Sequence, residues 1–163
     1  MSCSRRNALK LLAAAPLGAC GFQPLYGEGT VARNLNGLID VPILPGRFGF
    51  DLRQRLITRL GRAQAPQFML GIQTDIQQES RAILSDNTIT RFTLTAHADY
   101  EVIPIGRAQA VFRDRERAVT GYSTVASPFA TRAAEIDAFR RLAVSLAESM
   151  VVKLASTSRD WAA

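Results

Sequence analysis

Residues 91–102, RFTLTAHADYEV, alternate without interruption between polar and apolar side chains. The apolar set is Phe92, Leu94, Ala96, Ala98, Tyr100 and Val102, and the polar set is Arg91, Thr93, Thr95, His97, Asp99 and Glu101. Successive side chains of a strand point to opposite faces, so this pattern predicts a strand with one buried face and one wet face. We expect the sheet that contains it to have one packed face and one solvent-facing face.

The chain before this strand predicts a strand, a helix and another strand. Residues 39–44 alternate, and Pro42, which cannot donate a ladder hydrogen bond, places this first strand at a sheet edge. A leucine or phenylalanine recurs at every fourth position from residue 48 to residue 60, which predicts an amphipathic helix that ends at Gly61. Period two returns over residues 68–76. A strand, a helix and a strand in this order imply a right-handed parallel crossover.

The remainder of the chain predicts a polar connection, a fourth strand and a final helix. Residues 77–87 are polar, so we expect a loop there, and residues 108–125 predict a strand with a bulge within residues 113–117. Ser127 and Pro128 precede a long apolar stripe that is typical of a helix. The predicted fold is an α+β two-layer sandwich, a four-stranded mixed β-sheet with two helices on one face in the order β-α-β-β-β-α.

The N-terminus has the pattern of an export signal that ends at a lipid attachment site. Basic residues precede an apolar run, residues 11–19, which is too short to span a bilayer. The run ends in Leu17-Gly18-Ala19-Cys20, the bacterial lipobox pattern, in which the Cys20 thiol carries diacylglycerol as a thioether. Residues 4–10 resemble a twin-arginine signal except at Ala8, where that signal prefers phenylalanine. Twin-arginine export and general secretion are therefore both open.

These patterns divide the chain into a signal peptide with lipobox (residues 1–19), a lipidated tether (20–36), an α+β domain (37–155) and a C-terminal tail (156–163). Without the signal peptide, the chain has 17 of its 20 basic residues and 14 acidic residues. This small positive net charge is not typical of a nucleic-acid-binding protein. Of the 20 basic residues in the full chain, 18 are arginine and 2 are lysine, a bias that suits a phosphate-bearing partner. A GC-rich genome produces the same excess of arginine over lysine without any selection for function, so the composition alone leaves both explanations open.

Catalytic and metal-binding patterns are missing from the sequence. The chain has one histidine, His97, which alternates with polar residues on the wet strand face, and the mature chain has no free cysteine to pair with it. No Cys/His cluster indicates zinc, and no glycine-rich phosphate loop or nucleophile elbow is present. We therefore expect no enzyme, no catalytic residue, no metal and no cofactor other than the covalent lipid on Cys20.

Five arginines are candidates for contacts to the phosphates of an anionic glycolipid. Three of them, Arg113, Arg115 and Arg117, alternate with acidic residues, and Arg91 and Arg107 flank the ends of the third and fourth strands. Arginine binds phosphate bidentately, which supports this interpretation. The alternative is that residues 113–117 form a self-neutralised turn or bulge.

Several segments resemble the lipopolysaccharide-assembly lipoproteins (LptE) of alphaproteobacterial type. The matching segments are Cys20–Gly27 (CGFQPLYG), Ile89–Arg91 (ITR), Thr120–Ser123 (TGYS), Ser127–Thr131 (SPFAT) and Ala134–Ala138 (AEIDA). They run through essentially the whole chain in order, and the C-terminal block joined to the CGFQPLYG start is far more specific than the lipobox alone. The family's frequent Ser-Tyr-Asn is replaced here by Gly121-Tyr122-Ser123.

The resemblance implies an outer-membrane lipoprotein, anchored by its lipid, facing the periplasm and sitting inside an LptD-type β-barrel. Its implied partners are that barrel, lipopolysaccharide and the membrane, and its implied role is to help insert lipopolysaccharide into the outer leaflet. The family's lipopolysaccharide-contacting residues do not lie in the motifs that match here, so none is carried over to this chain. The choice of the five arginines depends on their charge and their positions near strand ends. The alternative is an accessory lipoprotein of another envelope transport complex.

Overall fold

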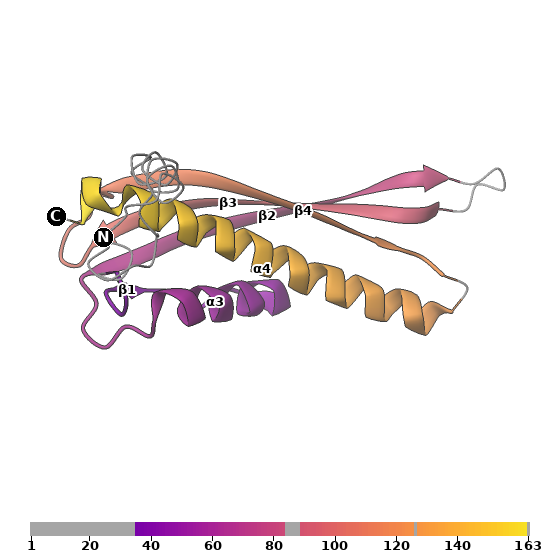
Figure 1. Ribbon diagram of the computed structural model, residues 1–163, viewed down its shortest axis with the longest axis horizontal. Coiled ribbons are helices and arrows are strands. Elements are labelled where there is room, and N and C mark those ends of the chain that lie inside the picture. Colours follow the sequence, from indigo (N-terminus) through magenta and orange to yellow (C-terminus); the bar gives the residue numbers. More distant parts are fainter. Residues whose placement is uncertain (1–34, 84–88, 126, 163) are drawn as a thin grey trace, which may run out of the picture.

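The computed structural model describes residues 35–83, 89–125 and 127–162. The predicted signal peptide, Cys20 and most of the predicted tether lie outside these residues. The elements are β1 (Ile39–Asp40), α3 (Gly46–Leu60), β2 (Phe68–Ile83), β3 (Ile89–Pro104), β4 (Phe112–Ser123) and α4 (Pro128–Trp161), arranged as Figure 1 shows. The order β-α-β-β-β-α and the α+β class confirm the prediction.

One mixed sheet contains the four strands in the order β1-β2-β3-β4. β1 pairs with β2 in parallel, and the other neighbours are antiparallel. The predicted edge position of the first strand is confirmed, but this strand ends at Asp40 rather than at residue 44. Pro42 removes a donor at this point, and the Arg53 Nε donates to the carbonyls of Val41 and Pro42 at 3.1 and 3.0 Å, which occupies their oxygens.

Two strand boundaries differ from the prediction. Residues 77–83, expected in a loop, continue β2, because they pair with residues 89–95 of β3. The fourth strand begins at Phe112 and has no bulge at residues 113–117, since its register with β3 advances without a shift. The irregular pairing lies instead in β2, between Ser80 and Ile83.

Capping residues fix the end of α3 and the start of α4. α3 ends at Leu60 and is capped by Gly61, which has a φ of 77°. A Cβ there would lie 1.8 Å from the Asn36 Oδ1, so only glycine fits. At the start of α4, the Ser127 Oγ accepts from the Ala130 N–H at 3.4 Å. Among the described residues, no helix combines the length and the apolar character needed to cross a bilayer.

α4 continues through the residues expected to form a tail. It ends at Trp161, whose ring meets Phe68 edge-on at 5.3 Å between centroids and stacks near Phe112 at 6.1 Å. Trp161 is 8% exposed and belongs to the core. Residues 156–161 are therefore part of the packed domain.

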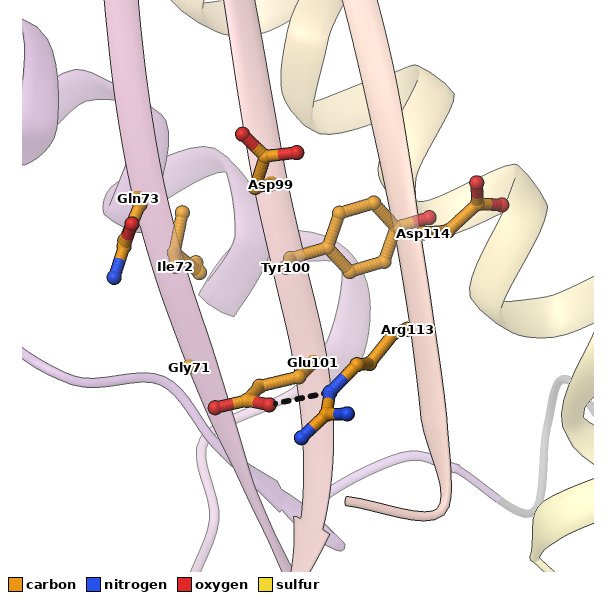
Figure 2. Close-up of a pocket in the computed structure, with 8 residues that line it drawn as sticks. All are labelled: Gly71, Ile72, Gln73, Asp99, Tyr100, Glu101, Arg113 and Asp114. Atoms are coloured by element: carbon orange, nitrogen blue, oxygen red, sulfur yellow. Dashed lines mark hydrogen bonds and ion pairs between the residues drawn. The ribbon is translucent and has the colours of Figure 1, made fainter.

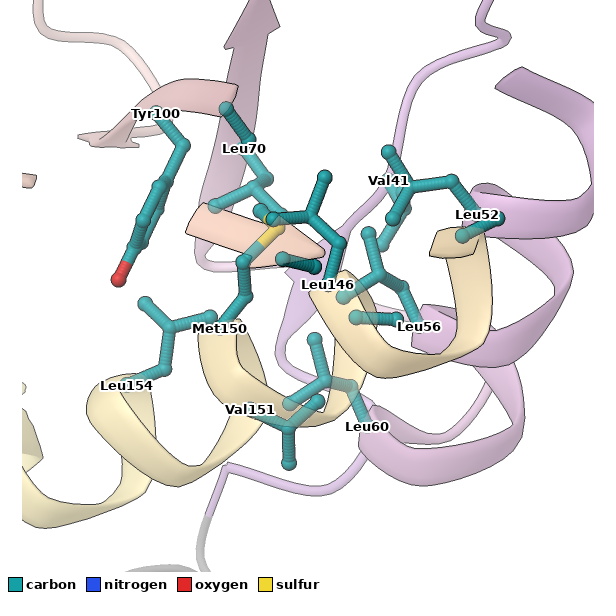
Figure 3. Packing of buried hydrophobic residues seen from close by; sticks show 14 of the residues in the cluster. Val41, Leu52, Leu56, Leu60, Leu70, Tyr100, Leu146, Met150, Val151 and Leu154 are labelled. Carbon is teal, nitrogen blue, oxygen red and sulfur yellow. The ribbon is translucent and has the colours of Figure 1, made fainter. Parts of the chain in front are cut away.

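The core lies between the apolar face of the sheet and both helices. Figure 3 shows Leu70 and Tyr100 from the sheet together with Leu56 of α3 and with Leu146 and Met150 of α4. The apolar residues of the alternating segment that identified β3 are buried or half-buried on this side, as the sequence predicted. The opposite side of the sheet, here called the outer face, has neither of the described helices packed on it (Figure 1).

Candidate functional site

The outer face presents three adjacent strands whose polar side chains lie in register. Residues directly opposite each other in a ladder share a face of the sheet. From β2 across β3 to β4, three successive rows are Asp75–His97–Arg117, Gln73–Asp99–Arg115 and Gly71–Glu101–Arg113. The register thus sets an arginine column on β4 beside an acidic pair on β3.

Two of these rows contain ion pairs between β3 and β4. Arg115 donates two hydrogen bonds to Asp99, at 2.6 and 2.7 Å, and the Arg113 Nε donates to Glu101 at 2.9 Å. The hydrogen bonds from Arg115 hold the pKa of Asp99 below its ordinary value. The acidic partners were visible in the sequence as polar positions of β3, but only the register pairs them with these arginines.

The alternating charges of residues 113–117 are sorted to the two faces of β4. The arginines project to the outer face, whereas Asp114 lies on the helix side, where Lys153 of α4 reaches it at 3.1 Å. The backbone N–H of Arg115 and the Lys153 ammonium lower the pKa of Asp114. The predicted turn or bulge is wrong, because a period-two charge pattern matches the pleat of a straight strand.

A pocket of about 600 Å³ opens beside these ion pairs, between Gly71 of β2 and Arg113 of β4 (Figure 2). Gly71 leaves room for the side chain of Glu101, because a Cβ at Gly71 would lie 2.9 Å from the Glu101 Cγ. The Glu101 carboxylate extends toward Gly71 and accepts from Arg113 there. This pocket therefore combines one arginine with acidic and amide groups.

The five predicted arginines do not form one site. All five are exposed, and Arg113, Arg115 and Arg117 lie together on the outer face. Arg91 and Arg107 lie at opposite ends of the sheet, one near the start of β3 and the other in the turn after it. No ion pair joins Arg91, Arg107 or Arg117 to another described residue, whereas Arg113 and Arg115 already have acidic partners.

The described residues contain no arrangement typical of catalysis. No group of three His, Cys, Asp or Glu side chains among them is placed to hold a metal ion. His97 lies half-buried on the outer face, and its Nδ1 has no hydrogen-bond partner within the described part of the chain. Tyr100 is 3% exposed, and burial raises the pKa of its phenol, which keeps it protonated.

Solved structures share this fold. A Caulobacter crescentus protein described as a lipoprotein matches with a TM-score of 0.65 and 23% identity, over 77% of this chain and 94% of that chain. Rare lipoprotein B from Shewanella oneidensis matches with a TM-score of 0.57 and 12% identity, over 77% and 97%. A lipoprotein B from Nitrosomonas europaea matches with a TM-score of 0.58 and 12% identity, over 85% and 93%.

No protein-family model and no curated protein matches the sequence. The structural matches confirm the resemblance at the level of the fold, since rare lipoprotein B structures have the LptE fold. Each neighbour is a bacterial protein described as a lipoprotein, and this chain covers nearly all of each one. The chain therefore has an LptE-like lipoprotein fold.

Proposed function

We propose that this protein is the lipid-anchored subunit of an outer-membrane lipopolysaccharide translocon. In this role it occupies the lumen of an LptD-type β-barrel and assists the insertion of lipopolysaccharide into the outer leaflet. The anchor is the acylated Cys20, and residues 20–36 connect it to the domain. In this proposal the domain acts by binding rather than by catalysis, and Cys20 in the tether carries the lipid.

One observation carries this proposal: the described domain matches rare lipoprotein B over 97% of that chain. The match also covers 77% of this chain, with a TM-score of 0.57. The CGFQPLYG segment at the lipobox and the order of the other matching segments support the same family. A surface that bears charge on an uncovered sheet face is also compatible with a polar barrel lumen.

The arginines supply the proposed contacts to lipopolysaccharide. Arg91, Arg107 and Arg117 have no ion pair with a described residue, so a phosphate reaches them without displacing a carboxylate. Arg113 and Arg115 keep guanidinium N–H groups that could still reach a phosphate, but Glu101 and Asp99 already neutralise part of their charge. The first three arginines are therefore the primary contacts in this proposal.

The test is affinity purification of the full lipidated protein from solubilised outer membrane. We expect a large barrel protein of LptD type to co-purify, and lipopolysaccharide with it. If a different envelope complex co-purifies instead, the protein is an accessory lipoprotein of that complex. A matched sample with Cys20→Ala controls for association that depends only on the membrane.

A further inference from the structure

Within the described part of the chain, a long edge of β2 has no neighbouring strand. β1 pairs only with Phe68 and Met69, the first two residues of β2. From Leu70 onward, no described strand lies beside β2 on that side, although β2 continues to Ile83. The free edge from Leu70 to Ser80 is about 36 Å long at 3.3 Å per residue, which is ample for a strand of ordinary length.

The fold itself keeps this edge free. Asp40 is the last residue of β1, and the Arg53 side chain of α3 binds the next two carbonyls, those of Val41 and Pro42. These oxygens are therefore directed to a guanidinium rather than to β2. An extension of β1 along β2 would have to break both hydrogen bonds and would still lack the Pro42 donor.

The edge of β2 has fewer of the features that usually prevent strand addition than the edge formed by β4. Proteins protect free edges with lysine, proline, bulges or inward charges. β4, at the other edge, has five consecutive charged residues at 113–117. From Phe68 to Ser80, β2 has no proline, lysine or arginine, and its charged residues are two separated acids, Asp75 and Glu79. Its register with β3 becomes irregular only after Ser80. The two edges of one sheet thus differ in protection.

The two faces of this edge define what fits beside it. On the helix side, Ile72 and Ile76 are only half-buried, and exposed Thr74 lies between them. On the outer side, Gln73 and Asp75 are exposed, and no basic side chain of β2 accompanies them. A complementary strand has apolar side chains on the first face and amide or basic side chains on the second.

We propose that an extended segment of the barrel partner adds to the Leu70–Ser80 edge of β2 as a further strand of this sheet. Its apolar side chains cover Ile72 and Ile76, and its outer side chains pair with Asp75. This inference rests on the proposed function for the identity of the partner. It goes beyond that function in assigning the surface and the mode of binding.

The test is site-specific photo-cross-linking of the full lipidated protein in intact cells. A photoreactive residue replaces Gln77 on β2 or, as a control, Val119, which is exposed on the outer face of β4. We expect the Gln77 position to cross-link to one short contiguous segment of the barrel protein. Moving the probe to Gln73 should shift the cross-linked site along that segment by about four residues, as strand pairing requires.

Two lysine variants on β2 test the mode of binding. Thr74→Lys places a charge on the face that the added strand would cover, and we expect it to lower the Gln77 cross-linking yield about tenfold or more. Gln73→Lys places the same charge on the outer face and should leave the yield within about twofold, because the charge there stays solvated and faces acidic groups. Thermal unfolding of both variants checks that the domain remains folded.

The outcomes separate this inference from the proposed function. Barrel cross-links at Val119 but not at β2 would overturn the strand addition and leave the translocon role intact. Cross-links from β2 to a second copy of this chain would also overturn it. If purification yields no barrel protein, the proposed function fails, and the partner named here fails with it.

Discussion

Arg115 of β4 and Asp99 of β3 form a two-point ion pair across the outer face, with Nε–Oδ1 and Nη2–Oδ2 distances of 2.6 and 2.7 Å. Both side chains are exposed, so water screens the ion pair and it adds little to the free energy of unfolding. Its main effect is to hold the two side chains in a fixed orientation on the outer face. Its effect on ionisation is nevertheless measurable. The Arg115 hydrogen bonds lower the pKa of Asp99 below its ordinary value of 3.8.

The ion pair predicts that the Asp99 carboxyl titrates at a lower pH in the folded protein than in the unfolded chain. A carboxyl whose pKa is lower in the folded state stabilises the fold above its ordinary pKa, and the contribution is lost as pH falls through the folded pKa. The NMR titration midpoint of the Asp99 carboxyl should therefore lie below 3.8 and should rise toward that value in Arg115→Gln. Arg113→Gln, in the next row, is the matched control and should leave the Asp99 midpoint nearly unchanged.

The two faces of β3 should differ strongly in their tolerance of truncation. Leu94 and Leu146 are both 0% exposed, and replacing either with alanine should cost about 2–5 kcal/mol of unfolding free energy. Thr95→Ala, on the outer face, should cost under about 0.5 kcal/mol in the isolated domain. Urea unfolding of the three variants measures this. Equal costs on both faces would contradict the one-sided core.

Trp161 tests whether the last helical turn belongs to the domain. Its ring packs between Phe68 and Phe112, and its Nε1 donates to the Thr157 Oγ1 at 3.2 Å. Trp161→Ala should lower the unfolding free energy by about 3–5 kcal/mol. Asp160→Ala, at the exposed neighbouring residue, should change it by less than about 0.5 kcal/mol. A dispensable Trp161 would restore the tail that the sequence suggested.

The proposed lipid anchor depends on a single thiol, that of Cys20. Cys20→Ala should yield an unacylated precursor or a protein released from the membrane, because stable anchoring requires acyl chains. Mass spectrometry of the mature N-terminus and membrane fractionation measure the two effects. An unmodified Cys20 in a membrane-bound wild-type protein would refute the lipoprotein assignment.

The arginines should differ in their contribution to lipopolysaccharide binding. A charge-assisted hydrogen bond is worth about 1.5–3 kcal/mol, so replacing Arg91, Arg107 and Arg117 together with glutamine should weaken binding well over tenfold. The double replacement of Arg113 and Arg115 should cost less, because a neighbouring carboxylate already neutralises part of the charge of each. The measurement is the affinity of the purified mature protein without its lipid for lipopolysaccharide at two salt concentrations, in the wild type and in both sets of variants. Circular dichroism checks that each variant is folded. Unchanged affinity in both sets would assign the phosphate contacts to other residues.

Local patterns determined the secondary structure because they depend on neighbouring residues. The alternation of residues 91–102 identified β3 and its buried face, and the four-residue spacing before Gly61 identified α3. The polar segment at residues 77–83 misled the prediction. The side chains of residues 77–80 are exposed, so no hydrophobic pattern marked that part of the segment as a strand, and only its pairing with β3 makes it one.

The sequence by itself determined the element order, the one-sided sheet, the edge position of β1 and the lipid attachment pattern. Tertiary structure alone decided which charges meet. Asp99 and Arg115 are 16 residues apart, and a register shift of one residue would have put them on opposite faces. The tertiary structure also decided that Arg53 binds the carbonyls of Val41 and Pro42, so that these residues do not continue β1 along the edge of β2. This contact joins a helix to a loop that lies 11 and 12 residues away in the sequence. Such contacts depend on the packing of whole elements, which no local spacing encodes.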